Sequence, residues 1–313
     1  MNFSSKRLYQ AALTADQMVL QISAFRLGPE CYITAMAKRP VYPLIFTDLD
    51  GTLLDHHNYS AKPADALARK LHQQSLAEVI PVTSKTYAEL LRLQQEIPLP
   101  FSLCVTENGS VIHGPESFFA GDDGRTGRIT MGIAYSAMLA QIGKLPGSLR
   151  NHFTGFADMS VEQVVDATGL AFDDAKRAKD RQATEPFLWS GTDDELEALA
   201  ATVAESGLRI QRGGRFYHLT GHATKEQAMG RIVDMIAGQK PDCDVVSIAL
   251  GDGPNDLAMI EAAHSGVIMP NPHGVTIVSA RPGVRTAAAS GPEGWVVAVT
   301  EVLAELGLNL RQS

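Results

Sequence analysis

Two aspartates, Asp48 and Asp50, stand one residue apart in the segment PLIFTDLDGTLLD at residues 43–55. The apolar residues 44–46 predict a buried strand, and Gly51 predicts a turn directly after the two carboxylates. Side chains at positions i and i+2 of a strand share a face, so the two carboxylates would lie close together and each would oppose ionisation of the other. A hydrophobic core gains nothing from such a pair. A bound metal ion, or a proton shared between an acid and a base, would account for it.

Further polar residues follow predicted strands in the same way. They are Thr83 and Ser84 in VTSKT, Lys225 at the start of a predicted helix, and Asp252 and Asp256 in GDGPND. Taken singly, a Ser or Thr after a strand is most often a helix cap, and a single lysine is most often solvated. Open α/β sheets bind ligands at the carboxyl ends of their strands, so we expect these residues to meet Asp48 and Asp50 at one edge of a sheet.

The combination suits phosphoryl transfer. A carboxylate that attacks a phosphate monoester is an anion approaching a dianion, so cations must neutralise the charge of both. Mg²⁺ prefers oxygen ligands and commonly bridges carboxylates to phosphate. We therefore expect a Mg²⁺ site formed by the carboxylates of Asp48, Asp50, Asp252 and Asp256. Asp256 would also orient Lys225 or a metal-bound water.

The same residues divide into roles for hydrolysis. Asp48 would be the nucleophile that forms an aspartyl-phosphate. Asp50 would protonate the leaving alkoxide and then deprotonate the hydrolytic water. Thr83 or Ser84 would hydrogen-bond to the phosphoryl oxygens, and Lys225 would offset negative charge.

Two stretches of the chain, residues 41–114 and 221–313, alternate apolar strands with helical segments. The expected helices are residues 60–76, 86–97, 225–238 and 255–263, and the further strands are residues 77–85, 245–253 and 265–270. Residues 101–114 would form a strand, a turn and a return strand. This alternation predicts an α/β core, with a parallel sheet covered by helices.

Residues 115–220 break the alternation. Helices expected at residues 131–143, 159–170, 172–180 and 197–207 are mixed there with strands at residues 186–191, 208–213 and 215–221. This mixture predicts an inserted α+β cap domain. Residues 1–40 would form an N-terminal extension, and we hypothesise that the folded domain begins near Pro40 and that residues 1–35 are dispensable. The alternative is a short amphipathic helix packed on the domain.

Composition and charge argue against several classes of protein. The 313-residue chain is 45% hydrophobic and 20% charged, which is typical of a globular protein with a sizeable core. A formal net charge of -8 and only 6% aromatic residues argue against a nucleic-acid-binding protein. The three cysteines are scattered and form no CxxC pair, which fits a reducing cytoplasm. No apolar run approaches the length of a membrane span, and residues 1–40 lack the apolar core of a signal peptide, so we expect a cytoplasmic protein without a membrane partner.

Four motifs in a fixed order resemble those of the haloacid dehalogenase-like hydrolases. They are DLDGT, a Thr/Ser pair after the second strand, a later lysine, and GDGPND. The resemblance covers nearly all of residues 41–313 and implies a Rossmann-like parallel core. The position of the insert resembles the sugar-phosphatase branch of that superfamily, which has a large α+β cap.

Finer features resemble the mannosyl-3-phosphoglycerate phosphatases within that branch. They are VTSKT at 82–86, ENG at 107–109, ATEPFLW and GGRFYHL in the cap, VIMPNPHG at 267–274, and GPEGW at 291–295. One departure is Thr224 before Lys225, where we expect Gly. The resemblance implies removal of phosphate from 2-O-mannosyl-3-phosphoglycerate to release mannosylglycerate, a compatible solute. The expected partner is therefore a small phosphorylated sugar.

Several polar residues are candidates for substrate binding, because a glycerate carboxylate and a sugar favour arginine and amide donors. They are Glu107, Asn108, Arg181, Glu185, Arg212 and Arg215. Arg212 and Arg215 flank two glycines in an expected hairpin. The alternative is that these residues only make turns or carry exposed charge. His56 and His57 follow the catalytic loop without a third ligand nearby, so we expect both to be solvated.

Other activities stay open from the sequence. A broader sugar-phosphate phosphatase would use the same residues, and so would a phosphosugar mutase, which returns the phosphoryl group to its substrate. A phosphorelay receiver also combines a parallel sheet with a phosphorylated aspartate, but the paired Asp48 and Asp50 and the large cap argue against it. A binding domain without catalysis would have no need of the full set of catalytic groups.

Overall fold

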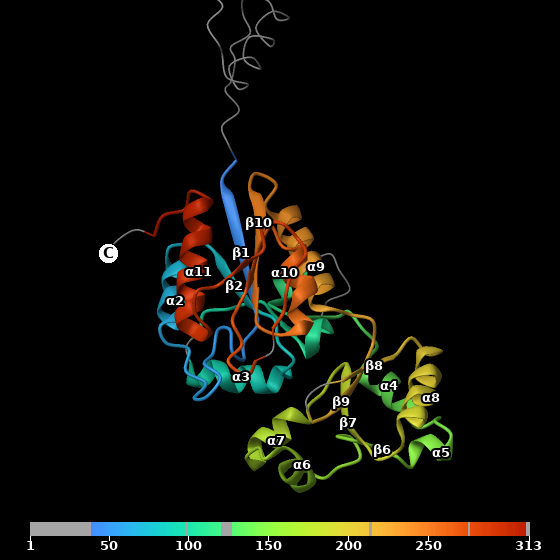
Figure 1. Ribbon diagram of the computed structural model, residues 1–313. Helices are drawn as coiled ribbons and strands as arrows, with labels where there is room; N and C mark the ends of the chain where they lie inside the picture. The colour runs from blue at the N-terminus through green and yellow to red at the C-terminus, as the bar shows by residue number, and fades with distance from the viewer. Residues whose placement is uncertain (1–38, 98, 120–126, 213–214, 275, 311–313) are drawn as a thin grey trace, which may run out of the picture. The chain divides into compact units, whose positions relative to one another are not determined.

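The computed structural model describes residues 39–97, 99–119, 127–212, 215–274 and 276–310 (Figure 1). Pro40–Ser313 forms one compact unit. Nearly all of the expected N-terminal extension lies outside the described residues, so its dispensability stays a prediction. Among the described residues, no helix is both long and apolar enough to cross a bilayer.

A five-stranded parallel sheet forms the centre of the α/β core. Its strands are β12 (Arg285–Thr286), β11 (Ser265–Ile268), β10 (Asp244–Gly251), β1 (Val41–Thr47) and β2 (Glu78–Pro81), in that order across the sheet. β1 pairs along its whole length with β10, from Val41 opposite Asp244 to Thr47 opposite Leu250. It also pairs with β2 on its other side. The expected strand at residues 44–46 is therefore an interior strand, with parallel neighbours on both sides.

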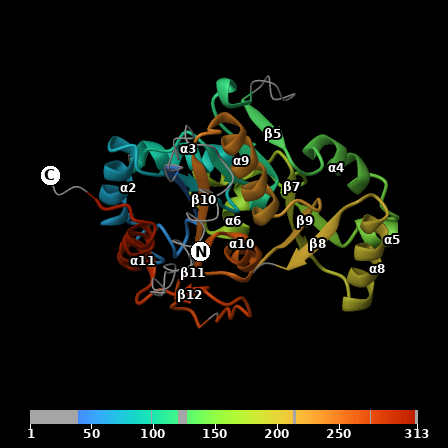
Figure 2. The ribbon, with the colours of Figure 1, turned by 90° about the horizontal axis from the view of Figure 1, so that it is seen from above.

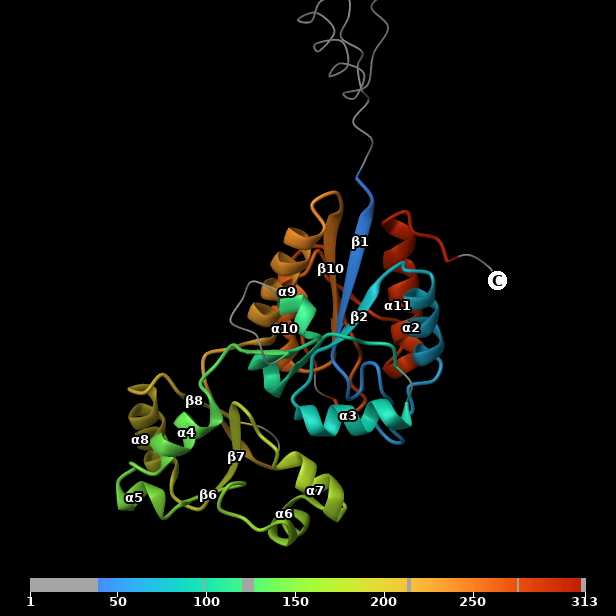
Figure 3. The ribbon, with the colours of Figure 1, turned by 180° about the vertical axis from the view of Figure 1, so that it is seen from behind.

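Helices cover both faces of this sheet, as Figures 1 and 3 show from opposite sides. One face carries α2 (Ala64–Gln73) and α11 (Gly291–Glu305), and the other carries α9 (Lys225–Gln239) and α10 (Leu257–Ala262). The side chains of β1 alternate between the two cores: Ile45 packs into the first, whereas Leu44 and Phe46 pack into the second. Burial on both faces explains why β1 is a continuous apolar run. The predicted α/β class is confirmed.

Most expected elements form close to their expected bounds, and local capping explains where several begin. α3 (Tyr87–Glu96) begins at Thr86, whose hydroxyl accepts from Glu89 N while the Glu89 carboxylate accepts from Thr86 N. Helix α9 begins at Lys225, after Thr224, whose side chain accepts from Gln227 N. α11 is not among the expected elements, although its buried residues from Trp295 to Leu303 recur at helical spacing. The two glycines and the proline of GPEGW at its start are untypical of a helix and obscure this pattern.

A second, three-stranded antiparallel sheet follows the parallel one along the chain. It consists of β3 (Cys104–Thr106), β4 (Val111–His113) and β5 (Arg128–Thr130). A parallel bridge between Val82 and Val105 links the end of β2 to β3. β5 pairs with β4, although it falls inside the expected cap range of 115–220. The exact cap boundary stays a prediction.

The inserted α+β segment has its own sheet of four antiparallel strands. They are β6 (Phe153–Gly155), β7 (Thr184–Trp189), β9 (Tyr217–Thr220) and β8 (Arg209–Arg212), in that order. Its helices are α4 (Tyr135–Ile142), α5 (Gly147–Arg150), α6 (Val161–Thr168), α7 (Phe172–Ala178) and α8 (Asp193–Ala204). α4, α5 and α8 pack with β6, β7 and β9 around one core, and Figure 2 shows these helices beside the sheet. α6 and α7 share a second, smaller core.

Candidate active site

The loop after β1 carries the two aspartates and turns sharply at Gly51. Asp48 N donates to Leu250 O at 2.9 Å, which extends the pairing of β1 and β10 by one residue. Gly51 has a φ of +78°, and a Cβ there would lie 2.0 Å from His56 Nε2. Only glycine fits this turn, as its place after the carboxylates predicts. Trp295 Nε1, in α11, donates to Thr47 Oγ1 at 3.1 Å, so α11 supports the end of β1 that precedes Asp48.

Lys225 joins two buried aspartates from different elements. Its Nζ lies 2.6 Å from Asp48 Oδ1 and 2.6 Å from Asp256 Oδ1. Burial opposes the charge of Lys225, but Asp256 and Asp48 outweigh it and raise the lysine pKa. Burial also raises the pKa of Asp48 to about 8, an effect that Lys225 counteracts and that the neighbouring Asp256 and Asp50 strengthen. The contact brings a positive charge to both carboxylates, and the catalytic role of Lys225 stays a prediction.

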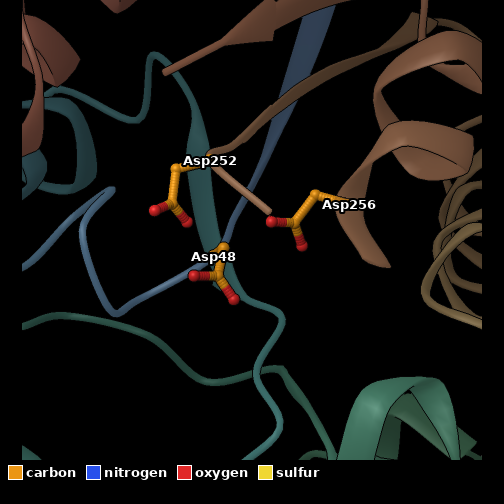
Figure 4. A group of neighbouring side chains, drawn as sticks. All are labelled: Asp48, Asp252 and Asp256. Atoms are coloured by element: carbon orange, nitrogen blue, oxygen red, sulfur yellow. The ribbon is translucent and has the colours of Figure 1, made fainter. Parts of the chain in front are cut away.

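Three buried carboxylates converge at the carboxyl ends of β1 and β10 (Figure 4). One ligand oxygen from each of Asp48, Asp252 and Asp256 lies within 4.8 Å of the others. Burial, then the charge of Asp256, raises the pKa of Asp252. Among the described residues, Lys225 contacts two of these three carboxylates, Asp48 and Asp256, so a divalent cation would relieve the remaining repulsion. Carboxylate oxygens are the ligands that Mg²⁺ prefers, and the residues present therefore fit such an ion.

Asp50, expected to be a fourth carboxylate ligand, is not part of this cluster. Its Oδ2 instead lies 2.7 Å from Lys85 Nζ, and its side chain is 38% exposed, against 12% for Asp48. Burial opposes the charge of Lys85, but Asp50 outweighs it and raises the lysine pKa. The other oxygen, Asp50 Oδ1, is buried without a hydrogen-bond partner among the described residues. Because part of its side chain is accessible, Asp50 could exchange a proton with a substrate beside Asp48.

Thr83 and Ser84 directly follow β2, the strand beside β1. Thr83 is buried, and its backbone N donates to Val105 O at 2.9 Å. Its hydroxyl accepts from Lys85 N at 3.2 Å, which shapes the loop that carries Lys85. Ser84 is exposed, and its carbonyl accepts from Arg181 Nη1 at 3.2 Å. The structure therefore places both hydroxyl residues at the same sheet edge as Asp48.

Glu107 and Asn108 follow β3 and contact two different parts of the chain. Glu107 is fully buried, and its carboxylate accepts from Gln182 N at 2.8 Å, Ala183 N at 3.0 Å and Thr184 Oγ1 at 2.6 Å. These contacts tie the end of β3 to the start of β7. Asn108 Oδ1 accepts from Asn255 Nδ2 at 3.2 Å, within the GDGPND run.

The other expected substrate-binding residues fall into two groups. Arg181 and Glu185 lie near the segment that Glu107 holds: Arg181 Nη1 donates to Ser84 O and to Thr184 Oγ1. Glu185 is fully buried, accepts from Tyr135 OH at 2.6 Å and Ala157 N at 2.7 Å, and has its pKa raised by burial.

Arg212 and Arg215 form the second group, at the expected β8–β9 hairpin. Both side chains are exposed. The Arg212 guanidinium lies 5.9 Å from the centre of the Tyr217 ring, and Arg215 Nη1 donates to Ala167 O. The structure thus brings Arg181 and Glu185 together with Glu107. It places Arg212 and Arg215 apart from them, at the β8–β9 hairpin.

Three further residues at the site were not assigned roles from the sequence. They are Lys85 beside Asp50, and His56 and Asn271 beside Asp252. The expectation that His56 is solvated is wrong: its side chain is only 15% exposed, and Nε2 lies 3.0 Å from Asp252 Oδ2. His57 is exposed, as expected. The position of Lys85 inside the VTSKT motif is a sequence feature that could have indicated its place at the site. His56 has no comparable feature, because its partner Asp252 is 196 residues away in the chain.

Comparison with known proteins agrees with this site. The family described as haloacid dehalogenase-like hydrolase matches residues 45–119. A glucosyl-3-phosphoglycerate/mannosyl-3-phosphoglycerate phosphatase from Persephonella marina is 32% identical over 277 residues, which span 84% of this chain and 98% of that protein.

Solved structures share the fold at lower sequence identity. A haloacid dehalogenase-like hydrolase from Bacillus subtilis is 19% identical, with a TM-score of 0.54 over 83% of this chain and 99% of that one. Sucrose-phosphatase from Synechocystis is 14% identical, with a TM-score of 0.52 over 87% of this chain and 99% of that one. These structures share the fold. The Persephonella relative and the family match show that the chain belongs to the haloacid dehalogenase-like hydrolases, in the family of the mannosyl-3-phosphoglycerate phosphatases.

Proposed function

We propose that this phosphatase hydrolyses mannosyl-3-phosphoglycerate to mannosylglycerate and phosphate, with Mg²⁺, through an aspartyl-phosphate on Asp48. The observation that carries the chemistry is the buried Asp48 carboxylate, bonded to Lys225 and clustered with Asp252 and Asp256. The substrate is proposed because the Persephonella relative, which the chain matches over nearly its full length, bears the name of a phosphatase for the glucosyl and mannosyl compounds.

The metal site would consist of Asp48, Asp252 and Asp256. The hydrogen bonds described for Asp48 use Oδ1, and those for Asp252 use Oδ2, so each of these two carboxylates has a second oxygen to offer a cation. Both oxygens of Asp256 accept hydrogen bonds, Oδ1 from Lys225 Nζ and Oδ2 from Gly253 N, so a cation would share an oxygen of Asp256 with one of these donors. A bound Mg²⁺ would neutralise charge on the phosphate and on the carboxylates. Lys225, Asp48 and Asp256 would remain in contact on the other side of the cluster.

In the first half-reaction, a carboxylate oxygen of Asp48 attacks the phosphorus of the substrate. The bond from phosphorus to the glycerate oxygen breaks, and Asp50 gives its proton to that oxygen. The products are the aspartyl-phosphate on Asp48, ionised Asp50 and free mannosylglycerate. Lys85 Nζ, which lies 2.7 Å from Asp50 Oδ2, would hold the carboxyl group in place for this transfer.

In the second half-reaction, water attacks the same phosphorus and gives a proton to Asp50. The bond from phosphorus to the Asp48 oxygen breaks, so phosphate leaves and both aspartates return to their starting forms. Thr83 and Ser84 would donate hydrogen bonds to the phosphoryl oxygens in both steps. Lys225 would balance the charge of Asp48 before attack and after release.

A substrate panel tests the proposal. Phosphate release would be measured with Mg²⁺ for mannosyl-3-phosphoglycerate, glucosyl-3-phosphoglycerate, mannose 6-phosphate, sucrose 6-phosphate and 3-phosphoglycerate. We expect the highest kcat/KM for the mannosyl compound and no turnover in Asp48→Asn, which lacks the nucleophile.

Each other result changes a specific part of the proposal. A preference for the glucosyl compound would keep the chemistry and correct the sugar. Equal turnover of the simple hexose phosphates would reduce the assignment to a broad sugar-phosphate phosphatase. Full activity in Asp48→Asn would overturn the mechanism.

A further inference from the structure

His56 occupies a place in the loop after β1 that is shaped for its ring. A Cβ at Gly51 would lie 2.0 Å from His56 Nε2 and 2.3 Å from His56 Cε1, so the ring lies against the bare Cα of the turn. On its other side the ring contacts His273 edge-on, with 4.9 Å between ring centres. The side chain is only 15% exposed. These contacts hold the imidazole in one position.

The ring is directed at one oxygen of a candidate metal ligand. Nε2 lies 3.0 Å from Asp252 Oδ2. An ionised carboxylate can only accept hydrogen bonds, so Nε2 carries the donated proton when Asp252 is charged. Asn271 Nδ2 donates to the same oxygen at 2.7 Å. Two donors from separate loops, one after β1 and one after β11, therefore converge on Oδ2.

This convergence leaves the second oxygen of Asp252 for the carboxylate cluster. Figure 4 shows one oxygen of Asp252 directed toward Asp48 and the other directed away from it. A carboxylate held at one oxygen cannot rotate without losing both hydrogen bonds. Partners of this kind orient metal ligands and raise the affinity for the ion.

We propose that His56 is a positioning residue for the metal site: with Asn271, it holds Asp252 Oδ2 so that Oδ1 faces the cation. This inference rests on the metal site of the proposed function. It assigns His56 an action through Asp252, with no direct contact to substrate or metal. His57, the next residue, is exposed and has no such action.

The test is the dissociation constant for Mg²⁺, measured by calorimetry on the whole chain without substrate. His56→Ala removes the donor, and we expect Kd to rise roughly 10- to 100-fold. His56→Gln places an amide donor at about the reach of Nε2, so it should recover most of the affinity. His72→Ala, which removes an exposed histidine at the end of α2, is the matched control and should leave Kd unchanged.

Folding and coupling are checked separately. Thermal unfolding in EDTA shows whether each variant keeps the metal-free fold. If His56→Ala does not fold, the comparison is made between His56→Gln and His56→Asn. The side chain of Asn is too short to reach Asp252, so only the His56→Gln variant should bind Mg²⁺ with nearly the affinity of the wild-type chain. Asn271→Ala should also weaken binding. In the double variant the loss should differ from the product of the two single losses, because both donors act on one oxygen.

Several results would overturn the inference. One is an unchanged Kd in folded His56→Ala, and another is equal affinity in the Gln and Asn variants. A double variant whose loss equals the product of the single losses would show that the two donors act independently. If the wild-type chain releases phosphate and binds Mg²⁺ while His56→Ala binds it equally well, only this inference fails. If the wild-type chain binds no Mg²⁺, the metal site of the proposed function fails with it.

Discussion

At the scale of single residues, the two aspartates of the DLDGT motif have different neighbours. Asp48 is buried and bonded to Lys225, whereas Asp50 is partly exposed and paired with Lys85. Different surroundings are how two carboxylates in one site come to have different roles. The enclosed Asp48 suits a nucleophile, and the accessible Asp50 suits a group that exchanges protons with a leaving group and with water.

The variant Asp50→Asn tests this division. The amide side chain could neither give nor take the proton, so both half-reactions should slow and kcat should fall roughly 10²- to 10⁴-fold. Substrate affinity should change little, because Asp48, Lys225 and the metal cluster are untouched. Rapid-quench measurement of phosphate release, together with substrate binding to the variant, separates the two quantities.

The control for this variant is Asp193→Asn, which removes an exposed carboxylate from the first turn of α8. Its kcat should equal that of the wild-type chain. A normal kcat in Asp50→Asn would show that another group handles the protons. A loss confined to substrate affinity would mean that Asp50 binds substrate instead.

At the scale of elements, Glu107 links the end of β3 to the start of β7. Its buried carboxylate accepts three hydrogen bonds from residues 182–184. A substrate-binding role for Glu107 stays a prediction, but these contacts already give the carboxylate a structural task. They hold the segment whose Arg181 donates to Ser84 in the loop after β2.

Glu107→Gln should loosen this link. The amide has one accepting oxygen in place of two, and its NH₂ group would face a backbone N–H or a hydroxyl. At least one buried donor would lose its partner, at a cost of about 1–3 kcal/mol in the free energy of unfolding. Urea unfolding measures that cost, and amide hydrogen exchange at Gln182 and Ala183 should become faster.

Glu195→Gln is the matched comparison, because Glu195 also accepts from a backbone N–H, that of Thr192, in the capping box of α8. Capping boxes use Gln as well as Glu at this position, and the position is solvent-accessible. The free energy of unfolding should therefore change by less than about 0.5 kcal/mol. Equal losses in the two variants would contradict a special role for the Glu107 link.

At the scale of the whole molecule, buried histidines make stability depend on pH. His113 in β4 stacks on Tyr87 of α3 with 3.9 Å between ring centres, and its Nε2 lies 3.1 Å from Thr106 Oγ1. Burial, then the charge of Arg128, lowers the pKa of His113 from 6.5 to about 4. The histidine therefore stays neutral in the folded chain at a pH where the unfolded chain would protonate it.

The sign of the effect follows from this difference. Between pH 6.5 and pH 4 the unfolded state binds more protons, so the free energy of unfolding should fall as pH falls through that window. The contribution of His113 should be on the order of 2–3 kcal/mol. Urea unfolding from about pH 7 to about pH 4 measures it, and His113→Gln should show a shallower fall. An identical pH profile in the variant would mean that His113 is not the group responsible.

The sequence by itself determined the α/β class and named the residues that are proposed here for catalysis. Strands such as β1 and β10 are short, mostly apolar runs, and helices such as α3 and α9 begin directly after the capping residues Thr86 and Thr224. These signals are local in the chain. Because the carboxyl ends of parallel strands meet at one edge, local signals were enough to predict that Asp48, Lys225 and Asp252 lie together.

Only the tertiary structure decided which partner each group has. The contact of Lys225 with Asp48 spans 177 residues, that of His56 with Asp252 spans 196, and that of Trp295 with Thr47 spans 248. Glu107 likewise meets its donors some 75 residues away. The same side chains could have paired otherwise without any change in local pattern. Hydrogen bonds and ion pairs form over about 3 Å, and only the packing of distant elements brings atoms to that distance.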